Sequence, residues 1–268
     1  MARSALLNVM VQAVKKAGRG LARDFGEVEN LQVSLKGPGD FVSAADRRAD
    51  KVLIETLSRA RPGYGFLTEE SGEIPGSDTT HRWIVDPLDG TTNYLHGIPI
   101  FSVSLALERD GQIVAGVIYN PILDELYVAE RGAGAYLNDR RLRVSARRDL
   151  SNSVIAGGLG KLSTDARVRF VRENTFAITE AAGLRVNGSA ASDLAWVASG
   201  RLDGYWQHGL SPWDMAAGLI IVAEAGGLVS DAQGRQAMMQ TGSVVAGGAP
   251  IHRKILDAIR KAGAVVAD

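Results

Sequence analysis

The chain has 268 residues, of which 46% are hydrophobic and 22% are charged, a balance typical of a globular protein. Thirty basic and 30 acidic residues cancel, so bulk charge supports neither a nucleic-acid surface nor a membrane surface, and we expect neither partner. The sequence contains no cysteine, which excludes disulfides, thiolate metal sites and a cysteine nucleophile.

The N-terminal residues predict a packed amphipathic helix and not a signal peptide. Asn8 and Gln12 interrupt the apolar run, and no small-residue cleavage pattern follows it. Apolar residues recur instead at helical spacing, at Leu6, Met10, Val14, Ala17 and Leu21. No stretch reaches the roughly 20 apolar residues that a membrane span needs. We therefore expect a cytoplasmic protein.

The first half of the chain predicts two helices and a series of strands. Helices are expected over residues 4–25 and 43–60, the second capped by Ser43 and ended by Pro62. A short strand at 31–35 and a turn at 36–39 lie between them. Further strands are expected at 64–70, 81–86, 101–108, 112–120 and 124–130, with a hairpin at Arg109-Asp110-Gly111.

Beyond about residue 150 short strands alternate with helices. Strands are expected at 153–158, 202–207, 227–230 and 243–247, and helices at 165–179, 190–199, 212–225 and 250–262. This alternation predicts an α/β protein in which sheets are layered between helices. We expect two halves, residues 1–150 with the antiparallel meander and residues 151–268 with the alternating pattern.

The stretch from Trp83 to Asn93 is the most informative part of the sequence. A buried strand delivers Asp86 at its carboxyl end, and Pro87 predicts a turn that lets Asp86 and Asp89 face the same point. Gly90 allows close approach of the backbone to a ligand, and Thr91 opens a short helix. Two carboxylates beside a helix N-terminus suit a bound cation next to an anion, as phosphoryl chemistry requires. A simple turn followed by a helix cap remains the alternative.

Other acidic residues extend this pattern. Glu69 ends a strand and Asp214 opens a helix, although a solvated loop and a helix cap explain them equally well in isolation. Asp46, inside the second helix, is by itself typical of a surface residue. The four histidines never fall at helical ligand spacing, which argues against zinc. An all-oxygen ligand set favours Mg²⁺.

Three segments in this order resemble the inositol monophosphatase family, bacterial type, across nearly the whole chain. They are WIVDPLDGTTNYLHGIPIFSVSLAL, RVNGSAASDLAWVASGRLDGYW and SPWDMAAGLIIVAEAGG. The resemblance implies an α/β (α+β) sandwich of αβαβα layers, shared with fructose-1,6-bisphosphatase. It also implies a homodimer, two or three Mg²⁺ ions, and hydrolysis of a phosphate ester by metal-activated water.

The resemblance assigns roles to individual residues. It implies three metal sites: one at Glu69, Asp86 and the carbonyl of Leu88; a second at Asp86, Asp89 and Asp214; and a third, held mainly through water, near Glu69. Thr91 and Asp46 match the family's pair that orients the attacking water, with Glu69 beside them as a catalytic residue. The residues implied to bind substrate are Lys36, Asp89, Gly90, Thr91, Arg185, Gly188, Ser189, Ala190, Gln207 and Asp214.

Gln207 departs from the family pattern. The family usually has a glutamate seven residues before the aspartate of the last motif, where it contacts inositol hydroxyls. Glutamine loses the charge and one acceptor oxygen. Inositol 1-phosphate is the expected substrate. Other esters stay open, namely fructose 1,6-bisphosphate, 3′-phosphoadenosine 5′-phosphate, histidinol phosphate and other sugar phosphates. So does a different class, an interaction protein of a transcription complex.

Overall fold

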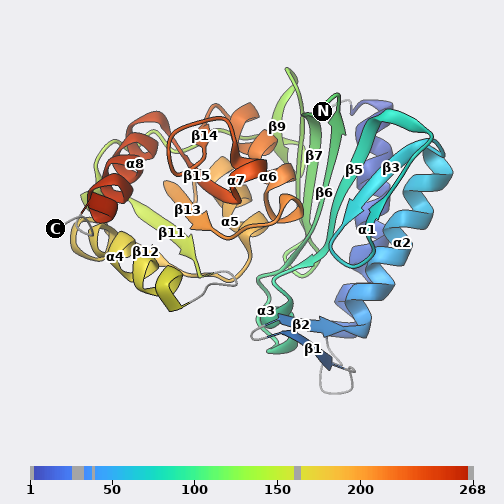
Figure 1. The fold of residues 1–268 in the computed structure, drawn as a ribbon. Coiled ribbons are helices and arrows are strands. Elements are labelled where there is room, and N and C mark those ends of the chain that lie inside the picture. Colours follow the sequence, from blue (N-terminus) through green and yellow to red (C-terminus); the bar gives the residue numbers. More distant parts are fainter. Residues whose placement is uncertain (1–2, 26–32, 38–39, 160–163, 265–268) are drawn as a thin grey trace.

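The protein is described by a computed structural model that covers residues 3–25, 33–37, 40–159 and 164–264. Its helices and sheets form five layers, helix, sheet, helix, sheet, helix, with the two halves of the chain side by side (Figure 1). The αβαβα sandwich implied by the resemblance is therefore confirmed.

The first two layers come from residues before 142. Helices α1 (Ala5–Phe25) and α2 (Ala44–Ala60) cover one face of an eight-stranded sheet of order β10-β9-β8-β7-β6-β5-β3-β4. Alternating side chains make this sheet two-faced: Trp83 and Val85 join the core under α1 and α2, whereas Ile84 joins the core on the opposite face. The strands are β3 (Tyr64–Thr68), β4 (Gly72–Ile74), β5 (Asp78–Asp89), β6 (Ser102–Arg109), β7 (Gln112–Asn120), β8 (Glu125–Glu130), β9 (Gly134–Leu137) and β10 (Arg140–Arg141).

The middle layer joins the two halves. Helices α5 (Ala190–Ala198) and α6 (Pro212–Glu224) come from the second half, yet their apolar residues share one core with Ile84 and Ile118 of the large sheet. Gly116 permits this packing, because a Cβ atom there would lie 2.6 Å from the Ile220 side chain. The start of α6 is thereby brought to the end of β5, where the acidic motif lies.

The last two layers lie entirely beyond residue 150. A five-stranded sheet of order β12-β11-β13-β15-β14 is covered on its outer side by α4 (Thr164–Glu180) and α8 (Ala249–Ala264). The chain passes from one sheet to the other between Arg141 and Val154, the interval that contains the expected division at 150. The strands are β11 (Val154–Gly158), β12 (Gly183–Arg185), β13 (Gly204–His208), β14 (Leu228–Ser230) and β15 (Ser243–Gly247).

Most long elements match the sequence predictions, and several short ones were missed. The hairpin is confirmed, since Asp110 and Gly111 both have positive φ and Arg109 pairs with Gln112. Elements without a prediction are β2 (Asp40–Ser43), which pairs with β1 (Val33–Gly37), the strands β4, β9, β10 and β12, the 3₁₀ turn Leu150–Asn152, and α7 (Met238–Thr241). Such short edge elements depend on pairing with a neighbour and carry little periodicity of their own. Within the described part of the chain, no helix combines the length and apolarity that crossing a bilayer would take.

Candidate active site

A bulge in β5 aims two aspartates in one direction. The strand does not turn at Pro87, as the sequence suggested, but continues to Asp89. Asp86 pairs with Ser104 and Asp89 with Ser102, so β5 has one residue more than β6 over this interval. In a regular strand, residues three apart face opposite sides, and the extra residue restores the same side for both.

The chain after the bulge begins helix α3 (Thr91–Leu95). Gly90 has φ 95°, and a Cβ atom there would lie 2.9 Å from the carbonyl oxygen of Ile100, so only glycine fits this turn. Thr91 follows at once, and its hydroxyl donates to the carbonyl oxygen of Leu88 at 3.0 Å. Two groups predicted for the site, the Thr91 hydroxyl and the Leu88 carbonyl, therefore lie within hydrogen-bond distance of each other.

Asp214 reaches the same place from the other half of the chain. It lies in the first turn of α6, where its Oδ2 accepts the backbone N–H of Ser211 at 2.7 Å. Ser211 is the N-cap residue, so Asp214 is not the N-cap that the sequence suggested but the third residue of the helix, in a capping box. This position does not exclude a ligand role, because a carboxylate has a second oxygen.

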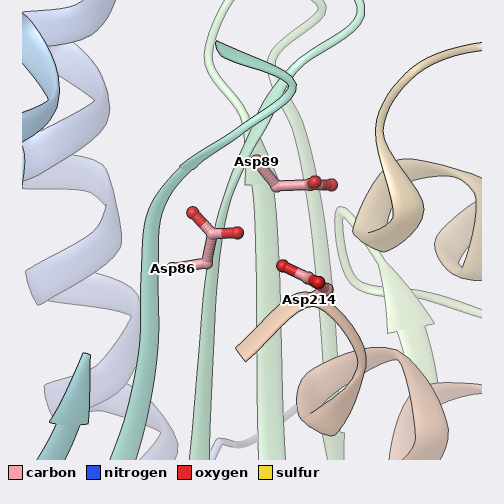
Figure 2. Close-up of side chains that lie close together, drawn as sticks. All are labelled: Asp86, Asp89 and Asp214. Atoms are coloured by element: carbon pink, nitrogen blue, oxygen red, sulfur yellow. The ribbon is translucent and has the colours of Figure 1, made fainter. Parts of the chain in front are cut away.

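Asp86, Asp89 and Asp214 form a compact acidic cluster. Their ligand oxygens lie within 4.8 Å of one another, and Figure 2 shows the three carboxylates converging. Each carboxylate accepts a backbone N–H: Leu88 donates to Asp86, Ala191 at the start of α5 donates to Asp89, and Ser211 donates to Asp214. These bonds hold the side chains in place, so the cluster is preorganised by the backbone of three elements.

Burial and neighbouring charges shift the pKa values of these carboxylates. Burial, and then the negative charges of Glu69, Asp89, Asp214 and Asp46, raise the pKa of Asp86 well above its usual value. Burial raises the pKa of Asp89 to about 6, although hydrogen bonds from Ser189 and the first amides of α5 act in the opposite direction.

Glu69 and Asp46 also belong to this neighbourhood, since both carboxylates act on the pKa of Asp86. Asp46 is 1% exposed, so it is not the surface residue that the sequence suggested on its own. The turn that carries Glu69 is tied to α2, because the Ser71 hydroxyl donates to the buried carboxylate of Asp50.

A cavity of about 390 Å³ opens beside the cluster. Its wall includes three acidic residues, Glu69, Asp89 and Asp214, and the described residues that line it include no lysine, arginine or histidine. The substrate-side segment contributes Gly188, Ser189 and Ala190 to the same wall.

Gln207 also lines the cavity. It lies on β13 and is 8% exposed, and its Oε1 accepts the hydroxyl of the fully buried Tyr205 at 2.7 Å. Gly158 on the neighbouring strand β11 leaves the space that the Gln207 side chain occupies. Neither Tyr205 nor Gly158 was predicted for the site, and nothing in the strand pattern distinguishes them.

Three predicted substrate residues, Gly90, Thr91 and Arg185, are not among the described residues that line the cavity. Arg185 is exposed on β12, and its guanidinium donates to the carbonyl oxygen of Leu184. Lys36 lies on β1, and its side chain is outside the described residues. All four assignments stay predictions.

Asn93 is a residue that the sequence reasoning overlooked. Its amide donates to the carbonyl oxygens of Ile100 and Asn187, each at 2.7 Å. Asn93 therefore fastens the acidic motif to the substrate-side segment. Its place in the motif after Thr92 was the available signal, because a buried amide in a ligand loop needs partners.

The donor set fits a hard divalent cation. Three carboxylates within 4.8 Å repel one another, and two of them are buried, where water screens charge poorly. A cation removes that repulsion, and an all-oxygen cluster with no thiolate or imidazole is the type of site that Mg²⁺ occupies.

The comparisons with known proteins agree with this geometry. The model of the inositol monophosphatase family matches residues 2–264. The chain belongs to the inositol monophosphatase family. It is 62% identical to inositol-1-monophosphatase of Mesorhizobium japonicum over 97% of this chain and 98% of the relative. It is 41% identical to Nus factor SuhB of Escherichia coli over 95% of this chain and 96% of that protein.

A solved structure supports the fold of this family member. The extragenic suppressor protein SuhB from Bartonella henselae is 56% identical, with a TM-score of 0.94 over 96% of this chain and 99% of that one. The chain is thus a phosphatase of this family by kinship, with a cluster that could hold a metal ion.

Proposed function

We propose that the protein hydrolyses inositol 1-phosphate to inositol and phosphate with bound Mg²⁺. The observation that carries the proposal is the convergence of Asp86, Asp89 and Asp214 beside a cavity that Gln207 also lines. The name of the 62% identical relative, inositol-1-monophosphatase, supports the substrate.

Five groups would hold the two or three ions: the carboxylates of Glu69, Asp86, Asp89 and Asp214, and the carbonyl of Leu88. When bound, Mg²⁺ lowers the pKa of the attacking water and neutralises charge on the phosphate. The acidic cluster itself cannot hold a phosphate dianion, since like charges repel at this distance. Substrate binding in this proposal therefore depends on the cation.

Residues of the protein would accept the proton of the attacking water and position the phosphate ester. The Thr91 hydroxyl, at the start of α3, and the buried Asp46 carboxylate are proposed to take the proton of the attacking water. The amides of Gly90 and Thr91 would bind phosphate oxygens. Gly188, Ser189, Ala190 and Gln207 line the space proposed for the alcohol, and Lys36 and Arg185 complete the predicted set.

Phosphate release tests the proposal. Purified protein is assayed with inositol 1-phosphate, fructose 1,6-bisphosphate, 3′-phosphoadenosine 5′-phosphate and histidinol phosphate, with Mg²⁺ and with a chelator. We expect the highest kcat/KM for inositol 1-phosphate and no turnover without metal. A higher value for another ester would assign that substrate, and turnover in chelator would contradict the metal role.

A second candidate is a role in a transcription complex, favoured by the 41% identical relative named Nus factor SuhB. A strain that depends on this protein separates the two. Loss of the biological effect on Asp86→Ala indicates the enzyme, whereas an interaction role tolerates that change. The homodimer and the cytoplasmic location also stay proposals, and analytical ultracentrifugation tests the first.

A further inference from the structure

Gln207 lies where two features restrict its side chain. It pairs with Gly158 of the parallel strand β11, and a Cβ atom at position 158 would lie 1.7 Å from Gln207 Oε1. The amide therefore fills the space that a side chain at 158 would need. Packed over β11 and 8% exposed, it has a narrow range of conformations.

The Tyr205 hydroxyl fixes the orientation of the Gln207 amide. Its hydroxyl is fully buried and donates to Gln207 Oε1 at 2.7 Å. Burial, and then the charges of Asp193, Asp89 and Asp214, raise the pKa of Tyr205 well above its usual value, so the hydroxyl keeps its proton. A buried hydroxyl proton needs an acceptor, and the amide oxygen can accept it whereas the amide nitrogen cannot. Oε1 is thus directed to the tyrosine and Nε2 away from it.

The charge of the cavity favours the same orientation. Glu69, Asp89 and Asp214 line the cavity together with Gln207. Amide N–H groups facing carboxylates are attracted, and an amide oxygen facing them is repelled. Without bound metal, the acidic lining therefore adds to the effect of Tyr205, which by itself leaves the amide nitrogen for the cavity.

We infer that Gln207 offers hydrogen-bond donors to the alcohol part of the substrate, so that the pocket accepts a ketone oxygen as well as a hydroxyl oxygen at this position. The inference rests on the proposed function and specifies which alcohols the pocket accepts. A carboxylate at position 207 only accepts, so it attracts a hydroxyl and repels a carbonyl oxygen. The amide removes that discrimination, because its N–H groups donate to a hydroxyl oxygen and to a carbonyl oxygen alike, and Tyr205 is the positioning residue that keeps these donors toward the cavity.

A matched pair of phosphate esters tests whether Gln207 acts as a hydrogen-bond donor to the substrate. Dihydroxyacetone phosphate and glycerol 3-phosphate have the same length and charge, and differ in a ketone or a hydroxyl at the second carbon. The kcat/KM ratio of ketone to alcohol is measured at saturating Mg²⁺ for the wild type, Gln207→Glu and the control Gln112→Glu. Gln112 is exposed on β7, so the control makes the same chemical change away from the cavity. We expect the ratio to fall about tenfold in Gln207→Glu, the scale of one lost hydrogen bond with repulsion added, and to stay constant in the control.

The variant Tyr205→Phe tests whether Tyr205 positions the Gln207 amide. It removes only the hydroxyl, which frees the amide to turn, so the ratio should fall about threefold through KM and not kcat. Circular dichroism melting checks that the variant is folded. An unchanged ratio in Gln207→Glu, or in a folded Tyr205→Phe, overturns the inference while phosphate release continues. Absence of phosphate release from every ester overturns the proposed function, and this inference with it.

Discussion

The acidic cluster and the surroundings of Gln207 are built in different ways. In the cluster, Asp86, Asp89 and Asp214 each accept a backbone N–H, so the main chain of β5, α5 and α6 sets their positions. Gln207 is placed instead by another side chain, Tyr205, and by the missing side chain of Gly158. Main-chain bonds survive most substitutions nearby, whereas side-chain contacts change with a single residue. The acidic cluster can therefore keep one chemistry while the surroundings of Gln207 are retuned to another alcohol.

The comparison predicts that the largest loss of turnover follows from a substitution in the acidic cluster. Asp86→Asn keeps an oxygen for the Leu88 N–H but loses the charge, so turnover should fall by at least about a thousandfold, or ~4 kcal/mol of barrier. Isothermal titration should show weaker Mg²⁺ binding. The fold should persist, because the change removes one charge from a cluster that repels itself.

Asp110→Asn, in an exposed hairpin turn that asparagine tolerates, is the matched control for this variant. Activity of Asp86→Asn within about tenfold of wild type would contradict the metal assignment.

Thr91→Ala should have the next largest effect. Loss of the hydroxyl removes proton-transfer help, so we expect kcat to fall on the order of 10²-fold with KM nearly constant. Steady-state kinetics at saturating Mg²⁺ measure both. A change confined to KM would mean that Thr91 only binds phosphate. In this structure the hydroxyl also donates to Leu88, so melting temperature is measured alongside.

A smaller change in activity is expected from a substitution at Gln207. In Gln207→Glu, one carboxylate oxygen can keep the Tyr205 hydroxyl while the other accepts a substrate hydroxyl. A charged acceptor strengthens a hydrogen bond enough to raise kcat/KM for inositol 1-phosphate about tenfold. Phenyl phosphate, which has no hydroxyl, should gain little. Equal gains for both esters would show that residue 207 does not contact the alcohol.

The last effect concerns stability without metal. The pKa of Asp89 is about 6 in the folded protein and 3.8 in the unfolded chain, so between these values the folded state binds more protons. The free energy of unfolding should then fall as pH rises from 4 to 6, by about 3 kcal/mol at most, and stay lower above pH 6. Added Mg²⁺ should restore the loss at pH 7.5. Urea unfolding at pH 5 and 7.5 measures this loss, and a pH dependence that is not reduced in Asp89→Asn would assign it to other groups.

The sequence alone predicted most long helices and strands and the acidic motif, because both rest on local patterns, whereas the order of the five layers was implied by the family resemblance. The strand pattern placed Asp86 at a carboxyl end, and the spacing of Asp86, Asp89 and Gly90 indicated a ligand loop. The predicted turn at Pro87 was wrong in form, since a bulge depends on the partner strand β6. Local sequence cannot report an extra residue against a neighbour that lies far along the chain.

Tertiary structure alone decided what surrounds that motif. The packing of α6 on Gly116 brings Asp214 to Asp86 across more than a hundred residues, and burial of α2 turns Asp46 from a surface residue into part of the site. The orientation of Gln207 is decided in the same way, by Tyr205 on its own strand and by the absence of a side chain at position 158 on the next. Charge, burial and hydrogen-bond direction belong to pairs of residues, and the pairs exist only once the layers have packed.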